Sequence, residues 1–404
     1  MEKKCTEEER NSINKKVIKF IEKNRPHINP STISIIIEKY IGLNNNNYKI
    51  IISDKESNKI LDEYFLKIFK NRLDNKKLES DVQKILGEKD LGPKVLELND
   101  EEKYRFDEFL PNISYIEFNI CLDENIIENI LKIILGFNNL YHFCHYNIDN
   151  NYKISYIENK SIMNKNKEII SIDFDINSFN QHINEYLPKG IIVLNKFIED
   201  YNVNKNIINL DNKIKNLKNY VDNYKSILVE EIYKHEGYFI FSHSDFHRGN
   251  VVHMGNNFDK LFVLDNEFVN LNLLGYDLIY YLVKSVFNHG IVENYFDLSK
   301  FYKIYLKYIN KFLNEFNGFK VDDNNIDNNN LINAKNYVEK IASSKEYFLR
   351  LVKLVLFFDI IYCCDLINFE NEFVNKKPIF GFFDYLYLNI EILKKIEVCD
   401  ISKI

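Results

Sequence analysis

The pattern of apolar and polar positions is most informative between residues 238 and 277. Two short apolar runs, Tyr238–Phe241 and Leu261–Leu264, flank a polar loop and a turn at Gly255. Short apolar runs bounded by polar and turn residues are typical of buried strands. We therefore expect two strands that bring the loop between them and the residues after the second run to one place.

Before this stretch, helical and strand patterns alternate. Residues 7–24 place apolar positions at helical spacing, and a second short helix is expected after the start signal at Pro30. Residues 40–53 are typical of two strands joined by a turn, and residues 63–71 of a further strand. Residues 78–94 then predict an amphipathic helix that stops at a Gly-Pro pair.

Helical periodicity dominates the rest of the chain. Apolar positions recur every three or four residues over residues 126–143, 276–289 and 298–316. A chain of this length is large enough for two lobes.

The polar loop and the end of the second apolar run carry the candidate chemistry. Asp245 and Asn250 lie in the loop, Asp265 follows the second run, and Glu267 comes two residues later. Transfer of a γ-phosphoryl group needs an oriented acceptor hydroxyl and Mg²⁺ held by hard oxygen ligands. Each residue alone is more simply a polar cap of a turn. The ordered set instead favours phosphotransfer, with Asp245 accepting a proton and with Asn250 and Asp265 facing the metal.

Two segments resemble known motifs. HSDFHRGN and VLDNEF are similar to the H-x-D-x-x-x-x-N and I-D-F-E-Y motifs of choline and ethanolamine kinases, within the aminoglycoside-phosphotransferase and protein-kinase-like group. The resemblance implies a protein-kinase-like, two-lobed α+β fold. It implies a small lobe with an antiparallel sheet at residues 1–110, which binds nucleotide, and a larger, mainly helical lobe at residues 111–404. It implies that His243 braces the loop and that Asp245 is the catalytic base. It also implies that Asn250 and Asp265 hold magnesium and that Glu267 assists the metal or the pocket. One departure is Asn266, where the family usually has Phe.

The resemblance extends to the nucleotide side. Asn45 falls in a segment similar to the family's phosphate-side hairpin. Lys67 alternates with apolar neighbours on its strand, and although a solvated lysine is the simpler interpretation of Lys67 alone, the Glu79 helix favours an ion pair that holds phosphates. The segment KYRFDEFLPN resembles the lobe connection that grips adenine through backbone groups. The residues that this implies are Asp107, Phe109 and Leu110.

The acceptor side matches the family less well. The substrate-side candidates are Asp277, Lys284, Phe358, Tyr362 and Tyr385. Asp277 resembles the Asp that anchors the catalytic loop, although a helix N-cap explains it equally well. The chain has no Trp, whereas the family builds a cationic cage with two, and Lys284 and Tyr280 stand where the family has Glu and Asn. A Lys284 that faces the acceptor disfavours a quaternary ammonium group, whereas one that swings to solvent has no such effect.

Composition and charge exclude several classes of protein. The chain has 404 residues, of which 46% are hydrophobic, and a net charge of −6, which argues against general nucleic-acid binding. Its six Cys lack C-x-x-C spacing, as expected of reduced cytosolic thiols. The charged first residues, and the lack of an apolar stretch of about 18 residues, favour a cytoplasmic protein without stable membrane insertion.

Three hypotheses follow. The leading one is an ATP- and Mg²⁺-dependent kinase of choline, ethanolamine or a similar small amino alcohol, acting first in phospholipid head-group synthesis and compatible with a homodimer. The second keeps fold and chemistry but has another small hydroxylated acceptor. The third is a catalytically silent relative that only binds nucleotide or a partner. Retention of Asp245, Asn250 and Asp265 argues against the third hypothesis.

Overall fold

The computed structural model describes most of the chain outside residues 158–237 and 360–388. The described residues are 5–40, 45–69, 76–138, 143–146, 154–157, 238–255, 257–285, 287–288, 291–292, 296–317, 335–356, 359, 389, 392–393, 395–396 and 404. They divide into two compact units. The first unit comprises residues 1–116 and 249–269, and the second comprises residues 117–248 and 270–404.

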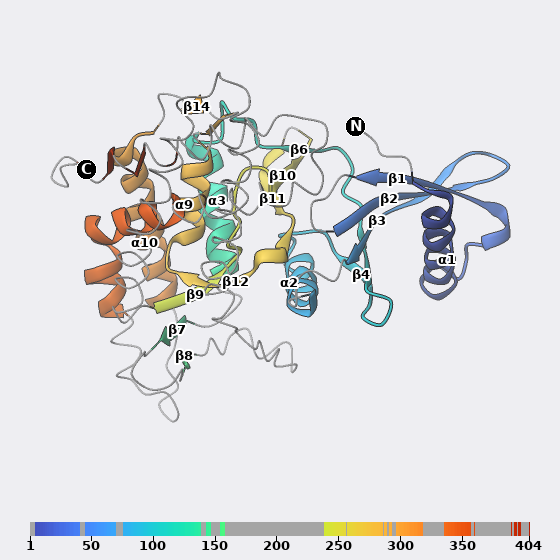
Figure 1. Ribbon diagram of the computed structural model, residues 1–404, viewed down its shortest axis with the longest axis horizontal. Helices are drawn as coiled ribbons and strands as arrows, with labels where there is room; N and C mark the ends of the chain where they lie inside the picture. The colour runs from blue at the N-terminus through green and yellow to red at the C-terminus, as the bar shows by residue number, and fades with distance from the viewer. Residues whose placement is uncertain are drawn as a thin grey trace, which may run out of the picture. The chain divides into compact units, whose positions relative to one another are not determined.

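A five-stranded antiparallel sheet forms the centre of the first unit (Figure 1). In spatial order its strands are β1 (Ile33–Tyr40), β2 (Asn45–Asp54), β3 (Ile60–Phe69), β5 (Tyr104–Glu108) and β4 (Val95–Asn99). The register pairs Lys67 of β3 with Arg105 of β5. Because directly opposed residues of an antiparallel pair project to the same face, the two long cationic side chains share one face of the sheet.

The expected helix after Pro30 is absent from the described residues there, and that prediction is wrong. Pro30–Thr32 form a single 3₁₀ turn, η1, and the chain then enters β1 directly. The segment that follows is rich in Ile, whose branched Cβ loses rotamer freedom in a helix and packs well on a pleated sheet. The β-propensity of this run competes with the Pro-Ser-Thr start signal, and pairing of β1 with β2 settles the outcome.

Two helices accompany this sheet. Helix α1 (Glu7–Asn24) begins with a capping box between Thr6 and Glu9. Its buried face, which includes Val17 and Phe20, belongs to one core with strand residues of the sheet, and the Phe20 ring stacks on Phe106 at 4.3 Å between centroids. Helix α2 (Lys76–Glu88) precedes β4 and carries Glu79 in its first turn.

A second, smaller sheet completes the first unit. Its strands are β11 (Asn257–Val263), β10 (Val251–Met254) and β6 (Ile113–Tyr115), all antiparallel. After β11 the chain passes through Asp265 into a 3₁₀ turn, η5 (Asn266–Phe268), which contacts α2. The segment with the expected metal ligands thus packs in the same unit as Lys67 and Glu79.

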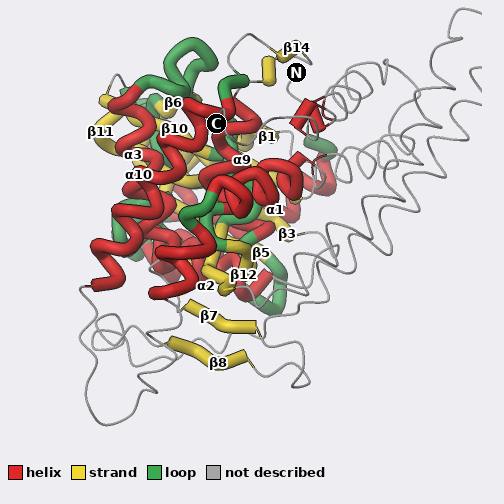
Figure 2. Tube along the Cα trace, turned by 90° about the vertical axis from the view of Figure 1, so that its left-hand side faces the viewer, coloured by secondary structure: helices red, strands yellow, loops and turns green. Residues whose placement is uncertain are grey.

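Helices make up most of the second unit's described secondary structure. Its described elements include α3 (Glu124–Asn138), β7 (Phe143–Tyr146), β8 (Ile154–Ile157), β9 (Tyr238–Ser242), β12 (Asn270–Leu273), α9 (Tyr276–Ser285), β13 (Phe287–Asn288), β14 (Ile291–Val292), α10 (Leu298–Asn317) and the π-helical turn η6 (Val338–Ala342). The chain is also helical at residues 345–356. Strands β12, β9, β7 and β8 form one antiparallel sheet. Helices α3, α9 and α10 pack against one another (Figure 2). Within the described segments, no helix combines the length and apolar content needed to cross a membrane.

Candidate functional site

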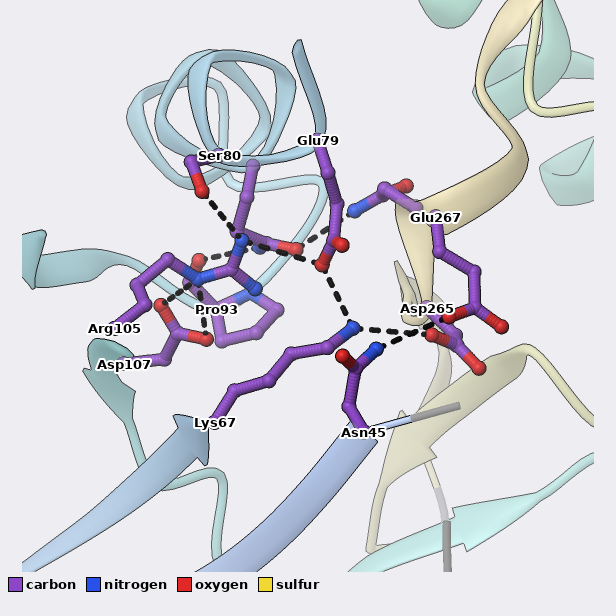
Figure 3. A network of polar contacts seen from close by, with 11 residues as sticks. Asn45, Lys67, Glu79, Ser80, Pro93, Arg105, Asp107, Asp265 and Glu267 are labelled. Carbon is purple, nitrogen blue, oxygen red and sulfur yellow. Dashed lines mark hydrogen bonds and ion pairs between the residues drawn. The ribbon is translucent and has the colours of Figure 1, made fainter. Parts of the chain in front are cut away.

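Lys67 lies at the centre of the nucleotide-side residues. Its side chain on β3 is buried, and Nζ lies 2.7 Å from Oε1 of Glu79 and 3.3 Å from Oδ1 of Asp265 (Figure 3). Burial alone would lower the pKa of Lys67, but the carboxylates of Glu79 and Asp265 raise it above its ordinary value. The structure therefore brings these three residues together around a charged ammonium group.

Arg105 is a second buried cation, which the motif comparison had not singled out. Its Nη1 lies 3.4 Å from Oε1 of Glu79, and its Nε donates to both oxygens of Asp107, at 2.8 and 3.0 Å (Figure 3). Burial would raise the pKa of Glu79, yet Lys67 and Arg105 lower it below its ordinary value. Glu79 is thus held ionised between two cations. The period-two alternation around Arg105 is the signal that could have revealed it.

The three residues expected at the lobe connection have different surroundings. The side chain of Asp107 is engaged by Arg105, and burial raises its pKa although Arg105 lowers it. The ring of Phe109 lies 4.2 Å from Nζ of Lys49. Leu110 is buried in a small apolar cluster with Val252 and Phe262. The adenine-binding role of their backbone groups stays a prediction.

The expected metal ligands carry side-chain oxygen atoms and lie beside two elements of the first unit. Asn250 comes directly before β10, Asp265 directly before η5, and Glu267 lies within η5. Asp265 adopts a left-handed backbone conformation, φ 58°, and its side chain is 48% exposed. Glu267 accepts a hydrogen bond from Nδ2 of Asn45 at 3.1 Å, and Asn250 is buried directly before β10. Across the described part of the chain, no three His, Cys, Asp or Glu side chains form a metal cluster by themselves. This donor set fits Mg²⁺, which usually combines one or two carboxylates with phosphate oxygens and water.

In the second unit, Asp277 fastens the start of the polar loop. Its two oxygens accept hydrogen bonds from the backbone N–H groups of His243, at 2.8 Å, and Ser244, at 2.9 Å. Burial raises the pKa of Asp277 to about 7, against the effect of these N–H groups. Ser244 has a φ of 66°, so the loop turns sharply under this carboxyl group. The geometry is that of a loop anchor, one of the two interpretations that the sequence left open.

His243 supports the loop from within the core of the second unit. It is fully buried, with ring centroid distances of 5.6 Å to Phe137 and 5.8 Å to Phe246. Its Nδ1 accepts a hydrogen bond from the backbone N–H of Asp245 at 3.3 Å. The His243 side chain therefore fixes the backbone at Asp245, as a bracing residue should.

Asp245 is held by two further side chains. Tyr280 on α9 donates its hydroxyl to Oδ1 of Asp245 at 2.9 Å, and Nε2 of His247 lies 3.6 Å from Oδ2. Burial would raise the pKa of Asp245, but His247, His243 and Lys284 lower it below its ordinary value. Asp245 is therefore an oriented, ionised carboxylate. The three-residue spacing from Asp277 to Tyr280 on one helix face signals this contact.

Lys284 forms an ion pair with Asp359, a residue whose side chain is fully buried. Asp359 also accepts a hydrogen bond from Nδ2 of Asn389, which is itself buried, at 2.9 Å. The ammonium group lies 5.4 Å from the ring centroid of Tyr280. Lys284 is thus turned inward and its charge is balanced. The other expected acceptor residues, Phe358, Tyr362 and Tyr385, lie outside the described residues.

No protein-family model and no curated protein sequence matches this chain. Solved structures do. A choline kinase from Cryptosporidium parvum has a TM-score of 0.55 at 16% identity, over 94% of this chain and 96% of that chain. An ethanolamine kinase from Plasmodium vivax has a TM-score of 0.55 at 13% identity, over 97% and 91% of the two chains.

A Ralstonia eutropha protein classed provisionally as an aminoglycoside phosphotransferase has a TM-score of 0.52 at 10% identity, over 94% of this chain and 98% of that chain. These likenesses show that the chain has the protein-kinase-like α+β fold of these phosphotransferases. The fold expected from the sequence motifs is confirmed.

Proposed function

We propose that this chain, which has the fold of choline and ethanolamine kinases, is a phosphotransferase that uses ATP and Mg²⁺ to phosphorylate the hydroxyl group of a small amino alcohol. The observation that carries the proposal is the ion pair between Lys67 and Glu79, with the carboxylate of Asp265 beside it. A buried, charged lysine next to an exposed carboxylate suits the phosphates of a metal-bound nucleotide.

The nucleotide side of the proposal uses groups of the first unit. Lys67 binds the α- and β-phosphates, and Glu79 holds it in place. Asp265, with Asn250 and Glu267, holds Mg²⁺, which neutralises the phosphate charge when it is bound. Arg105 keeps Glu79 ionised, so that Lys67 retains an anionic partner when the phosphates arrive.

The acceptor side uses groups of the second unit. Asp245 accepts the proton of the acceptor hydroxyl, and a lowered pKa keeps it ionised and able to orient that hydroxyl. Tyr280 and the backbone contact to His243 fix the direction of the carboxylate. Because phosphoryl transfer depends mainly on positioning, this fixation is the main contribution that the second unit makes to the rate.

Choline and ethanolamine are the acceptors that the motifs favour, and a choline kinase and an ethanolamine kinase are among the solved structures with this fold. A different small hydroxylated acceptor is the second candidate, and the absence of Trp from the chain supports it. Asp359 also balances the charge of Lys284, at a position where the resemblance implies a carboxylate. A cationic substrate would then rely on aromatic side chains alone.

An assay of ATP consumption tests the proposal. The purified protein is supplied with choline, ethanolamine, other amino alcohols and an aminoglycoside, each with and without Mg²⁺. We expect turnover that requires both Mg²⁺ and an amino alcohol. Turnover with the aminoglycoside alone would favour the second candidate. Nucleotide binding without turnover on any acceptor would favour a silent relative.

Replacing Tyr280 by Phe is expected to lower kcat about tenfold, because a hydrogen bond to a charged group is worth about 1.5 kcal/mol. The hydroxyl that orients Asp245 is lost, while the ring keeps its stacking on Tyr276. The KM for ATP should stay the same. Steady-state kinetics measure both constants, and an unchanged kcat would show that the hydroxyl does not position the base.

Replacing Asp359 by Asn is expected to expose the charge of Lys284 to the acceptor. At about 6 Å and an effective dielectric constant of about 20, repulsion of a cationic acceptor is about 3 kcal/mol, roughly a hundredfold in kcat/KM for choline. The double variant Lys284→Gln, Asp359→Asn is the matched control, since it removes both charges and should keep the parent value within a few-fold. Equal kcat/KM in all three proteins would place the pair away from the acceptor.

A further inference from the structure

Two buried amides connect the turn after Asp265 to helix α2. Asn266 is 1% exposed, and its Nδ2 donates to Oε1 of Gln83 at 2.7 Å. Gln83 is 2% exposed, and its Nε2 donates to the carbonyl oxygen of Pro93 at 2.7 Å. Two consecutive hydrogen bonds therefore connect η5, through Gln83 on α2, to Pro93, which lies two residues before β4.

This polar contact stands where the motif resemblance implies an apolar one. A buried amide is costly unless its groups are hydrogen-bonded, and Oδ1 of Asn266 has no partner among the described residues. An apolar pair of the same volume would avoid that cost. Two hydrogen bonds nevertheless fix distance and direction, whereas an apolar contact tolerates sliding. The pair is better suited to setting a position than to adding stability.

The side chain of Gln83 packs against Gly92, where the absence of a side chain leaves room for the amide. A Cβ added at Gly92 would lie 2.9 Å from Nε2 of Gln83 and 3.2 Å from the carbonyl oxygen of Val263, at the end of β11. Both distances are shorter than ordinary contacts. The amide therefore packs directly over backbone at Gly92, which leaves it little freedom to move away from Asn266.

The contact closes a ring of interactions around the proposed metal ligand. Glu79 and Gln83 are four residues apart on α2 and so lie on one face of the helix. Glu79 pairs with Lys67, Lys67 contacts Asp265, and Asp265 leads directly into Asn266. The left-handed conformation of Asp265 is thus held from two sides, by Lys67 through its side chain and by Gln83 through the next residue.

We infer that Asn266 and Gln83 are positioning residues that set the Asp265 carboxylate relative to Lys67 and Glu79, so that Mg²⁺-bound nucleotide meets a preformed site. The inference rests on the proposed function. It differs from a purely structural role, because it requires that the affinity for Mg-ATP depend on the hydrogen bond even where stability does not.

The test compares Asn266→Leu, Gln83→Met and the double variant with the parent protein. Thermal unfolding and calorimetric binding of ATP, with and without Mg²⁺, are measured on each. Each single variant leaves one buried amide without its partner and should unfold at a lower temperature. The double variant should recover part of the unfolding temperature, because both side chains are then apolar and of similar size, while the carbonyl group of Pro93 stays without the donor that Gln83 supplied.

The affinity for Mg-ATP should stay about tenfold weaker than the parent value in the double variant, while the affinity for ATP without Mg²⁺ is unchanged. Asn24→Leu is the matched control, because it removes another amide of the first unit, one that donates to Glu97 and to the backbone of Phe20 on α1. It should lower the unfolding temperature and keep the Mg-ATP affinity.

Mg-ATP affinity in the double variant within about twofold of the parent value would overturn the inference and leave the proposed function intact. A parent protein whose ATP affinity does not respond to Mg²⁺ would overturn the proposed function and the inference together. If the Asn24→Leu control lost as much Mg-ATP affinity as the double variant, the loss would come from general destabilisation of the first unit. That result would also contradict the inference.

Discussion

Replacing Asp245 by Asn is expected to lower phosphoryl transfer about a hundredfold or more while the affinity for ATP stays nearly unchanged. The amide keeps the size of the side chain and an oxygen for the Tyr280 hydroxyl, so the loop retains its shape. What is lost is the ionised oxygen that takes the acceptor proton, in a group whose pKa is lowered by His247, His243 and Lys284 against the effect of burial. Single-turnover rates and calorimetric ATP binding measure the two quantities separately.

Asp297→Asn is the matched control for this variant. Asp297 lies in the same unit and accepts hydrogen bonds from the backbone of Ser299 and Lys300 at the start of α10. Its replacement should leave the transfer rate unchanged. If the Asp245→Asn protein turns over within a few-fold of the parent rate, Asp245 is not the base, and the proton must leave by another route.

Replacing Asp265 by Ala is expected to abolish the effect of Mg²⁺ on ATP binding. The methyl group cannot coordinate a cation, and Lys67 keeps its 2.7 Å contact with Glu79, so the variant should fold. Titrating ATP into the protein at several Mg²⁺ concentrations checks this. The parent should bind more tightly as Mg²⁺ rises, and the variant should not respond.

Asp62→Ala is the control for Asp265→Ala, because it removes another carboxylate of the first unit. Asp62 on β3 pairs with Arg25 at 3.3 Å and has no place in the proposed metal site. Its loss should leave the Mg²⁺ response intact. A response that persists in the Asp265→Ala protein would mean that the metal is held elsewhere.

Much of the architecture could be predicted because it depends on local patterns. The helix at residues 7–24, the strands around the polar loop and the Lys67–Glu79 pair follow from periodicity and motif order. The helix expected after Pro30 failed because the cap signal competes with a run of β-branched residues, and only pairing with β2 decides between them.

The parts that the sequence could not predict depend on contacts between distant positions. Asn266 and Gln83 are 183 residues apart, and Lys284 and Asp359 are 75 residues apart. The residues next to each of these positions in the sequence contain no pattern that identifies the distant residue with which it pairs. The sequence therefore identified Lys284 as a cation but not as one whose charge is already balanced, and the expected repulsion of the acceptor now requires removal of Asp359.

The residues proposed to bind nucleotide and the residues proposed to face the acceptor belong to different units, and this affects how the acceptor specificity can change. Lys67, Glu79, Arg105 and Asp265 all pack within the first unit, whereas Tyr280 and Lys284 lie on α9 of the second. The ion pairs and hydrogen bonds described above for those four residues all lie within the first unit. A change of acceptor is therefore expected to need substitutions in the second unit, and laboratory evolution of a new acceptor should begin at position 284 and keep Tyr280, whose hydroxyl orients Asp245.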